Sequence, residues 1–156
     1  MFRLVTLNLN GIWTRQLQRD NFTNPSDPGR ANRILLELAD PRDQVNVNAS
    51  AKVGKFTFGY QFRWISRQVL NTYEDFFSLQ GRAPENADYA DRRYYPEVFY
   101  HDVRFDLEVD KRFNIYLGID NLTNRMPPLG LTGVGAGSGI YDNRGRYFYT
   151  GVVAKF

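Results

Sequence analysis

Residues 99–119 read FYHDVRFDLEVDKRFNIYLGI, and their side chains alternate between apolar and polar in two consecutive segments. From Phe99 to Val109 the odd positions are apolar except for His101, whereas the even positions are polar or charged. A period of two places the two kinds of side chain on opposite faces of a β-strand, because a helix would repeat every 3.6 residues. Lys111-Arg112 then marks a tight turn into a second alternating segment, so the stretch predicts an antiparallel hairpin.

The same alternation recurs on both sides of this hairpin. Residues 45–53 alternate, Gly54-Lys55 supplies a turn, and 56–64 alternate again. A further strand is expected near the start of the chain, around 5–13, and another from about 145 to 156. The sequence therefore predicts an all-β fold of about six strands in a single domain that spans 1–156.

The lengths of the connections indicate what kind of β protein this is. Short turns near Gly54 and Lys111 alternate with long polar segments at about 15–43, 67–97 and 123–144. Transmembrane barrels have short turns on one rim and long loops on the other, whereas connections in compact soluble domains have a median of about 4 to 6 residues. Strands of about 10 residues also suit a tilted crossing of the hydrocarbon layer. We therefore expect an antiparallel transmembrane β-barrel segment.

Six strands are fewer than the roughly eight of the smallest membrane barrels. An open sheet in a membrane would leave two unpaired edges. The chain is therefore expected to be the C-terminal end of a larger barrel whose earlier strands it does not contain.

The charged side chains of the 99–109 segment predict a hydrated barrel interior. Asp102, Arg104, Asp106 and Glu108 share one face, where lipid would make them costly and a polar lumen would tolerate them. We expect Arg104, together with Arg63 from another strand, to neutralise the carboxylates. Aromatic residues near the strand ends suit the interfacial girdles of a membrane barrel; these are Trp13, Trp64 and Phe99.

Two segments near the end of the chain resemble the closing segments of TonB-dependent outer-membrane receptors. Residues 121–128 read NLTNRMPP, and 141–149 read YDNRGRYFY after a glycine-rich stretch. Those receptors close with an N-L-F-(D/N)-x-x-P-P segment, a loop and a Y-D-x-x-G-R-x-(F/Y) entry to the last strand; Thr123 stands here where Phe is usual. The hairpin at 46–67 is also similar to the preceding hairpin of the family.

This resemblance implies a fold, a location and a function. The fold would be a barrel of about 22 strands, filled by an N-terminal plug domain that this chain lacks. The location would be the cell outer membrane of a Gram-negative bacterium. The function would be active uptake of a siderophore, metal chelate, glycan or similar nutrient, with TonB bound only through the missing N-terminal part. The partners implied are outer-membrane lipid, the barrel-assembly machinery and a small-molecule substrate of unknown identity.

The last strand carries a candidate assembly signal. Its apolar residues share one face and the chain ends on an aromatic residue; we assign the signal to Phe148, Val152, Ala154 and Phe156. In outer-membrane proteins such a strand is thought to be read by the assembly machinery through β-augmentation. An ordinary edge strand that happens to end in Phe is the alternative.

No catalytic, cofactor or metal site is predicted. The chain has no Cys and a single histidine, His101, which falls in the apolar register. The glycine-rich stretch at 130–139 lacks the Gly-Lys-Ser/Thr of a phosphate loop, and the carboxylates at 102–110 fit a charge ladder better than an acid/base pair. Basic and acidic residues are interleaved, which argues against nucleic-acid binding. The chain is therefore expected not to be an enzyme.

The long loops leave a second function open. Aromatic and arginine residues in 73–95 could bind a ligand or could pack against neighbouring loops. The alternative function is accordingly a soluble all-β ligand-binding module.

Overall fold

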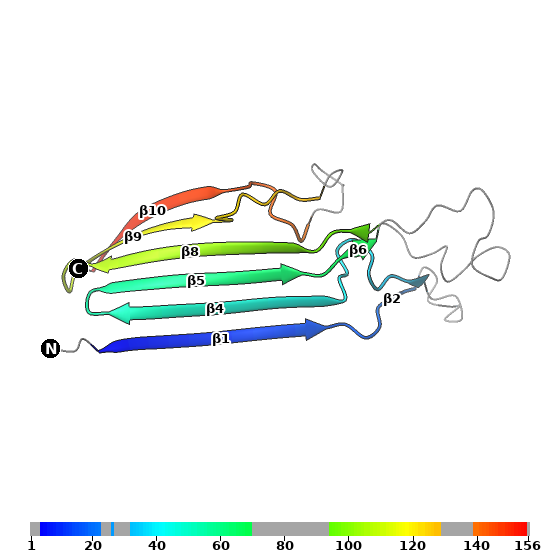
Figure 1. Cartoon of the computed structure of the whole chain (residues 1–156), viewed down its shortest axis with the longest axis horizontal. Helices are drawn as coiled ribbons and strands as arrows, with labels where there is room; N and C mark the ends of the chain where they lie inside the picture. The colour runs from blue at the N-terminus through cyan, green and yellow to red at the C-terminus, as the bar shows by residue number, and fades with distance from the viewer. Residues whose placement is uncertain (1–3, 23–25, 27–31, 70–93, 129–138, 156) are drawn as a thin grey trace.

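The computed structural model of the chain describes residues 4–22, 26, 32–69, 94–128 and 139–155. Six long strands form one antiparallel sheet in the order β1-β4-β5-β8-β9-β10 (Figure 1). Their bounds are Val5–Arg15, Asp43–Val53, Phe56–Ile65, Val98–Glu108, Phe113–Asp120 and Tyr147–Ala154. The predicted all-β fold and its six strands are thus confirmed, with ends that differ by one or two residues from most of the predicted ones.

Four two-residue strands were not predicted from the sequence. β2 (Asp20–Asn21) pairs with β3 (Asn32–Arg33), and β6 (Gln68–Val69) pairs with β7 (Tyr94–Tyr95). All four lie in the connections that the sequence predicted to be long. Among the described residues no helix is long and apolar enough to cross a membrane.

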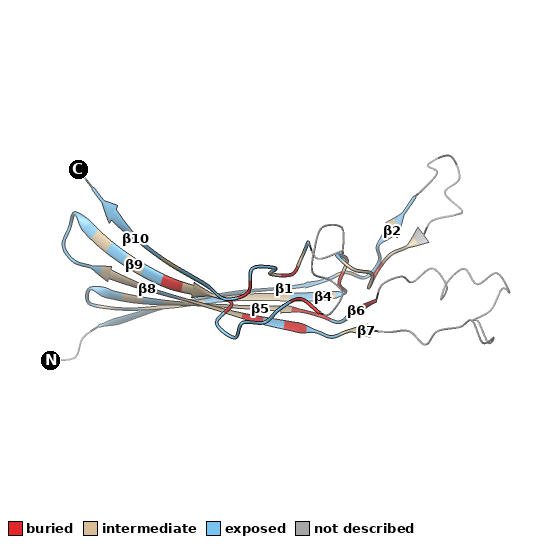
Figure 2. Cartoon of the chain, turned by 90° about the horizontal axis from the view of Figure 1, so that it is seen from above, coloured by how far each residue is buried: buried red, intermediate tan, exposed pale blue. Residues whose placement is uncertain are grey.

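The sheet is open, because β1 and β10 are its two edges and do not pair with each other. Figure 2 shows it strongly twisted, with β1 and β10 diverging at the end where the chain termini lie. A right-handed twist of this kind follows from the backbone sterics of L-residues. The structure thus shows a β-sheet that could belong to a barrel wall and does not show a closed barrel.

Both short turns lie at the same end of the sheet. In the two-residue turn between β4 and β5, Gly54 has φ +61°, a conformation that glycine adopts without a side-chain clash. In the turn between β8 and β9, the Asp110 carboxylate accepts hydrogen bonds from the backbone N–H groups of Arg112 (2.7 Å) and Phe113 (2.9 Å). The described ends of the three long connections lie at the opposite end of the sheet (Figure 1). The predicted one-sided distribution of loops is therefore present.

The strand register divides the sheet into an apolar face and a polar face. Cross-strand partners point to the same face, so the rows Trp13–Val45–Trp64–Phe99 and Phe58–Phe105–Leu117–Thr150 belong together. Among the described residues of the sheet, no charged side chain lies on the apolar face between the Trp13 row and the turn end. It is also open to its surroundings, since Leu7 and Leu9 are 74% and 79% exposed.

The fully buried residues gather at the loop end instead of beneath the sheet. Ile65, Val98 and Tyr100 lie at the loop ends of β5 and β8, and Tyr141 packs against them from the β9–β10 connection. Leu38, Tyr95 and Ile140 cover this cluster. The small core therefore joins the loop bases to the polar face of the sheet.

The polar face and the loop-end clamp

Ion pairs cross the polar face from β4 to β8. Arg63 pairs with Asp102 at 3.3 Å, and Lys52 pairs with Glu108 at 3.5 Å. Arg104 holds Asp106 by two hydrogen bonds, at 2.8 and 2.9 Å. The register places all four residues assigned to the lumen, Asp102, Arg104, Asp106 and Glu108, on this one face. Each of these charges has an opposite charge beside it, which a hydrated surface tolerates well.

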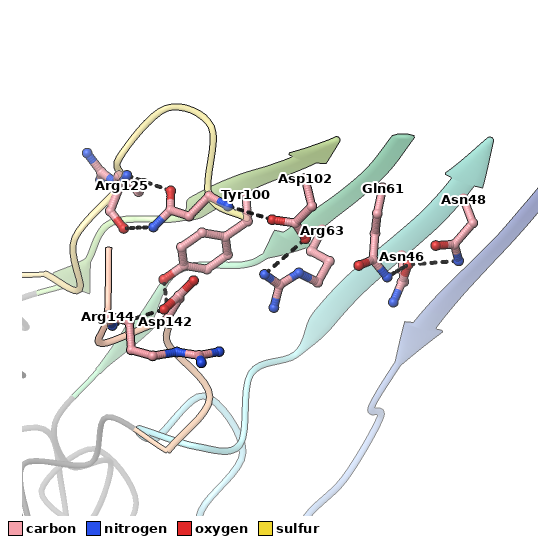
Figure 3. Close-up of polar contacts among 10 residues, drawn as sticks. Asn46, Asn48, Gln61, Arg63, Tyr100, Asp102, Arg125, Asp142 and Arg144 are labelled. Atoms are coloured by element: carbon pink, nitrogen blue, oxygen red, sulfur yellow. Dashed lines mark hydrogen bonds and ion pairs between the residues drawn. The ribbon is translucent and has the colours of Figure 1, made fainter. Parts of the chain in front are cut away.

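A neutral strip of amides continues the polar face toward β1. The Asn46 side-chain oxygen accepts hydrogen bonds from the amide groups of Asn48 (3.2 Å) and Gln61 (3.1 Å), as Figure 3 shows. Asn8 on β1 donates to the Ser50 hydroxyl on β4 at 3.4 Å. The polar face thus changes from uncharged on β1 to charged on β8, and Lys52 is the charged residue that β4 contributes to this face.

Tyrosine rings lie over glycines where β9 meets β10. Tyr149 is paired with Gly118 and Tyr116 with Gly151, so each strand supplies one ring and one glycine. A Cβ at Gly118 would lie 2.2 Å from Cζ of Tyr149, and one at Gly151 would lie 2.4 Å from the Tyr116 hydroxyl. The Arg104 guanidinium lies 4.3 Å from the centre of the Tyr116 ring. The glycines are therefore needed for the rings to lie flat on the sheet.

A shallow hollow of about 240 Å³ opens beside these rings. Its polar lining consists of Asn48, Gln61, Asp102, Arg104, Asp120 and Tyr149. Gly59 lies at its base, where an added Cβ would meet nothing closer than Arg104 at 3.7 Å. Water or a polar solute in this hollow would meet both hydrogen-bond donors and acceptors.

Asn121 begins the connection that follows β9, and it is fully buried. Its side chain donates to the Arg125 carbonyl (2.8 Å) and accepts from the Arg125 N–H (2.7 Å). Its backbone N–H donates to the Asp102 carboxylate at 2.7 Å, which joins this turn to the ion pair with Arg63 (Figure 3). Asn121 has φ +52°, a left-handed conformation that Asn tolerates better than most residues.

The other end of the same connection is fixed by three more hydrogen bonds. The Tyr100 hydroxyl accepts from the Asp142 N–H at 3.0 Å, and the Asn124 side chain accepts from the Arg146 N–H at 2.9 Å. Gln68 donates to the Tyr141 hydroxyl at 2.6 Å, and burial raises the pKa of this phenol. The two ends of this connection are fixed by Tyr100, Asn121, Asn124, Tyr141 and Asp142. We call these five residues the loop-end clamp.

The loop-end clamp unites the two segments on which the family resemblance rests. Sequence reasoning identified 121–128 and 141–149 as motifs but did not predict their mutual contacts. The glycine at position 145 is the sequence signal for these contacts. The structure gives the reason: Gly145 has φ +70°, and a Cβ there would lie 2.9 Å from the Asn124 side chain. The motif residues therefore have a structural reason for their identities.

The other residues singled out in the sequence lie away from this site. Phe148, Val152 and Ala154 are exposed on the apolar face of the edge strand β10, and Phe156 lies outside the described residues. His101 is on the apolar face beside Tyr60. Of the loop residues proposed for ligand contact only Tyr94 and Tyr95 are described, and the glycine-rich stretch is described only at Gly139.

The described residues include no group of three His, Cys, Asp or Glu side chains arranged to hold a metal ion. No family model matches the sequence, and no curated protein is significantly similar to it. The likeness to TonB-dependent receptors therefore rests on the sequence motifs alone.

Proposed function

We propose that this chain forms the C-terminal part of the barrel wall of a TonB-dependent outer-membrane transporter, where it contributes to uptake of a siderophore, metal chelate, glycan or similar nutrient. The observation that carries the proposal is the division of one six-stranded sheet into two faces: an exposed apolar face, free of charged side chains in its described part from the Trp13 row to the turns, and a polar face of paired charges. A surrounding that is apolar on one side and hydrated on the other suits both faces, and the wall of a membrane barrel has such a surrounding.

The dimensions of the apolar face support a lipid contact. From Phe56 to Trp64, β5 extends about 27 Å, which corresponds to about 20 Å across a membrane at a tilt of about 40°. The apolar band of a membrane barrel is about 25 Å tall. The row Trp13–Val45–Trp64–Phe99 closes this band at the loop end. Both indole N–H groups bond to acidic side chains, Asp43 for Trp13 and Glu97 for Trp64, as in an interfacial girdle.

The two open edges support incorporation into a larger barrel. Unpaired backbone groups are costly in hydrocarbon, so β1 and β10 need further strands there. All neighbours in the sheet are antiparallel, and an even number of strands brings both termini to the turn end. The exposed β10, with Phe148 and Val152 on its outer face, would then be the strand that the barrel-assembly machinery binds.

Fractionation of cells that make the protein tests this proposal. An antibody against the β8–β9 hairpin should detect it in the outer-membrane fraction, in a band that migrates faster before boiling than after, as folded barrels do. Detection in the soluble fraction, with no such shift, would overturn the proposal in favour of a soluble ligand-binding module. Loss of nutrient uptake in a deletion strain, screened across iron chelates and glycans, would then identify the substrate.

A further inference from the structure

Tyr60 and His101 form a polar pair within the apolar face. The Tyr60 hydroxyl lies 2.7 Å from Nδ1 of His101, and their ring centres are 6.1 Å apart. Phe62 is the register partner of His101 and lies against it, with ring centres 5.5 Å apart. Both members of the pair are only half-buried. The pair is therefore accessible from the side that the proposed function assigns to lipid.

The Tyr60–His101 pair has one more hydrogen-bond donor than its mutual hydrogen bond uses. A neutral imidazole carries one N–H and a phenol carries one O–H, which makes two donors. Their mutual hydrogen bond uses one of them, whichever tautomer the ring adopts. Either Nε2–H of His101 or the Tyr60 hydroxyl then remains as a donor, and within the described residues neither has another acceptor.

The other polar groups of this face already donate to protein acceptors. The Trp13 and Trp64 indoles donate to carboxylates, and the Thr150 hydroxyl donates to the Tyr116 carbonyl at 2.8 Å. A donor without an acceptor is costly in hydrocarbon. The Tyr60–His101 pair is thus the place on the described apolar face where an external acceptor is needed.

The depth of the pair indicates which acceptor is within reach. His101 lies two residues from Phe99 along β8, which is about 7 Å along the strand and about 5 Å toward the membrane centre at the usual tilt. The Phe99 row belongs at the membrane–water interface. The acyl ester carbonyls of lipids lie just beneath the headgroups, whereas phosphates lie farther out.

We infer that the Tyr60–His101 pair is a lipid-binding site that donates a hydrogen bond to an acyl ester carbonyl of a membrane lipid. This inference rests on the proposed function, because it requires the apolar face to contact lipid. The site selects for a linkage in the lipid and not for its charge, since a phenol and a neutral imidazole carry no net charge.

Competition between ester- and ether-linked phosphatidylcholines of equal chain length tests the site. The two lipids share one phosphate headgroup, so a preference between them isolates the carbonyl. The protein is reconstituted in nanodiscs with equal amounts of both lipids, and the lipids retained after release are counted by native mass spectrometry. The most tightly held ester lipid should be enriched about fivefold, the effect of one typical net hydrogen bond.

The matched variant carries both Tyr60→Phe and His101→Phe, because either single change leaves one donor in place. This double variant should lose the ester preference. Equal retention of both lipids by the unchanged protein would overturn the inference, and this result does not depend on whether the variant folds. Quenching of Trp13 and Trp64 fluorescence by brominated acyl chains is measured in the same samples. Quenching without an ester preference overturns only the lipid site, whereas no quenching overturns the lipid-facing surface and the proposed function with it.

Discussion

At the scale of single residues, Asn121 is a buried position whose side chain makes two hydrogen bonds to the backbone. Replacing it with Ala removes both hydrogen bonds to Arg125 and leaves a non-glycine residue at φ +52°. We expect Asn121→Ala to lower the free energy of unfolding by about 2 to 4 kcal/mol, measured by urea titration in detergent. Asn121→Gly should lose less, because glycine adopts this φ without strain. Equal losses would show that the conformation contributes nothing.

Two glycines that flank Arg104 in one row should respond differently to the same change. Gly118 lies beneath the Tyr149 ring, whereas Gly59 opens onto the shallow hollow. We expect Gly118→Ala to destabilise the protein by about 1 to 2 kcal/mol, because the ring must move away, and Gly59→Ala to have little effect. Urea titration of both variants measures this. Adding Tyr149→Ala should make Gly118→Ala nearly neutral, and fully additive losses would contradict the proposed ring contact.

At the scale of elements, two ion pairs between strands differ in how deeply they are buried. The Asp102 side chain is 12% exposed beside Arg63, whereas the Lys52–Glu108 pair is about half exposed. Arg63→Met should therefore cost about 1 to 3 kcal/mol, and Lys52→Met less than about 0.5 kcal/mol. Chemical unfolding followed by tryptophan fluorescence compares the two. Similar losses would mean that solvent screens both pairs equally.

Docking of β6 onto the β9–β10 connection should weaken at alkaline pH. Burial raises the pKa of Tyr141 above the unfolded value of about 10. The stability that this phenol contributes is therefore complete below about pH 10 and is lost as pH rises through the folded pKa. We expect the difference in unfolding free energy between the unchanged protein and Tyr141→Phe to be constant below about pH 10 and to narrow as pH rises above it. A constant difference would contradict this linkage.

The elements also show what could be predicted from sequence. The four strands of the two hairpins were predictable because apolar and polar residues alternate in each over at least seven positions. β1 and β10 alternate less regularly, since Ile12 and Val153 fall on the polar face. The two-residue strands, such as β6, are too short to show any period. The loop-end clamp depends on pairs such as Tyr100 and Asp142, which are 42 residues apart. No local pattern predicts such contacts, although the positive φ of Asn121 and Gly145 explains why Asn and Gly suit those two positions.

At the scale of the whole molecule, a charge placed on the apolar face distinguishes the proposed function from the soluble ligand-binding module. Leu117 lies in the middle rows of the apolar face and is 51% exposed. In a bilayer, Leu117→Lys should cost about 2 to 4 kcal/mol. In a soluble module the same change at an exposed position should cost almost nothing.

Val153→Lys is the matched control, because Val153 is 43% exposed on the polar face of the adjacent strand β10. Val153→Lys should leave the free energy of unfolding nearly unchanged both in a bilayer and in a soluble module. Both variants are compared by unfolding in lipid vesicles. Equal stabilities would exclude a lipid contact for the apolar face.

The loop-end clamp also affects which parts of the sequence can change during evolution. The connection from β9 to β10 is held near both of its ends, by Asn121 and Asn124 on one side and by Asp142 and Arg146 on the other. These bonds involve backbone groups and strand residues, so they do not depend on the residues between Pro128 and Gly139. Mutation can therefore rewrite or lengthen that stretch while the strands keep their register. In the proposed transporter, changes there would alter ligand specificity and leave the inherited sheet intact.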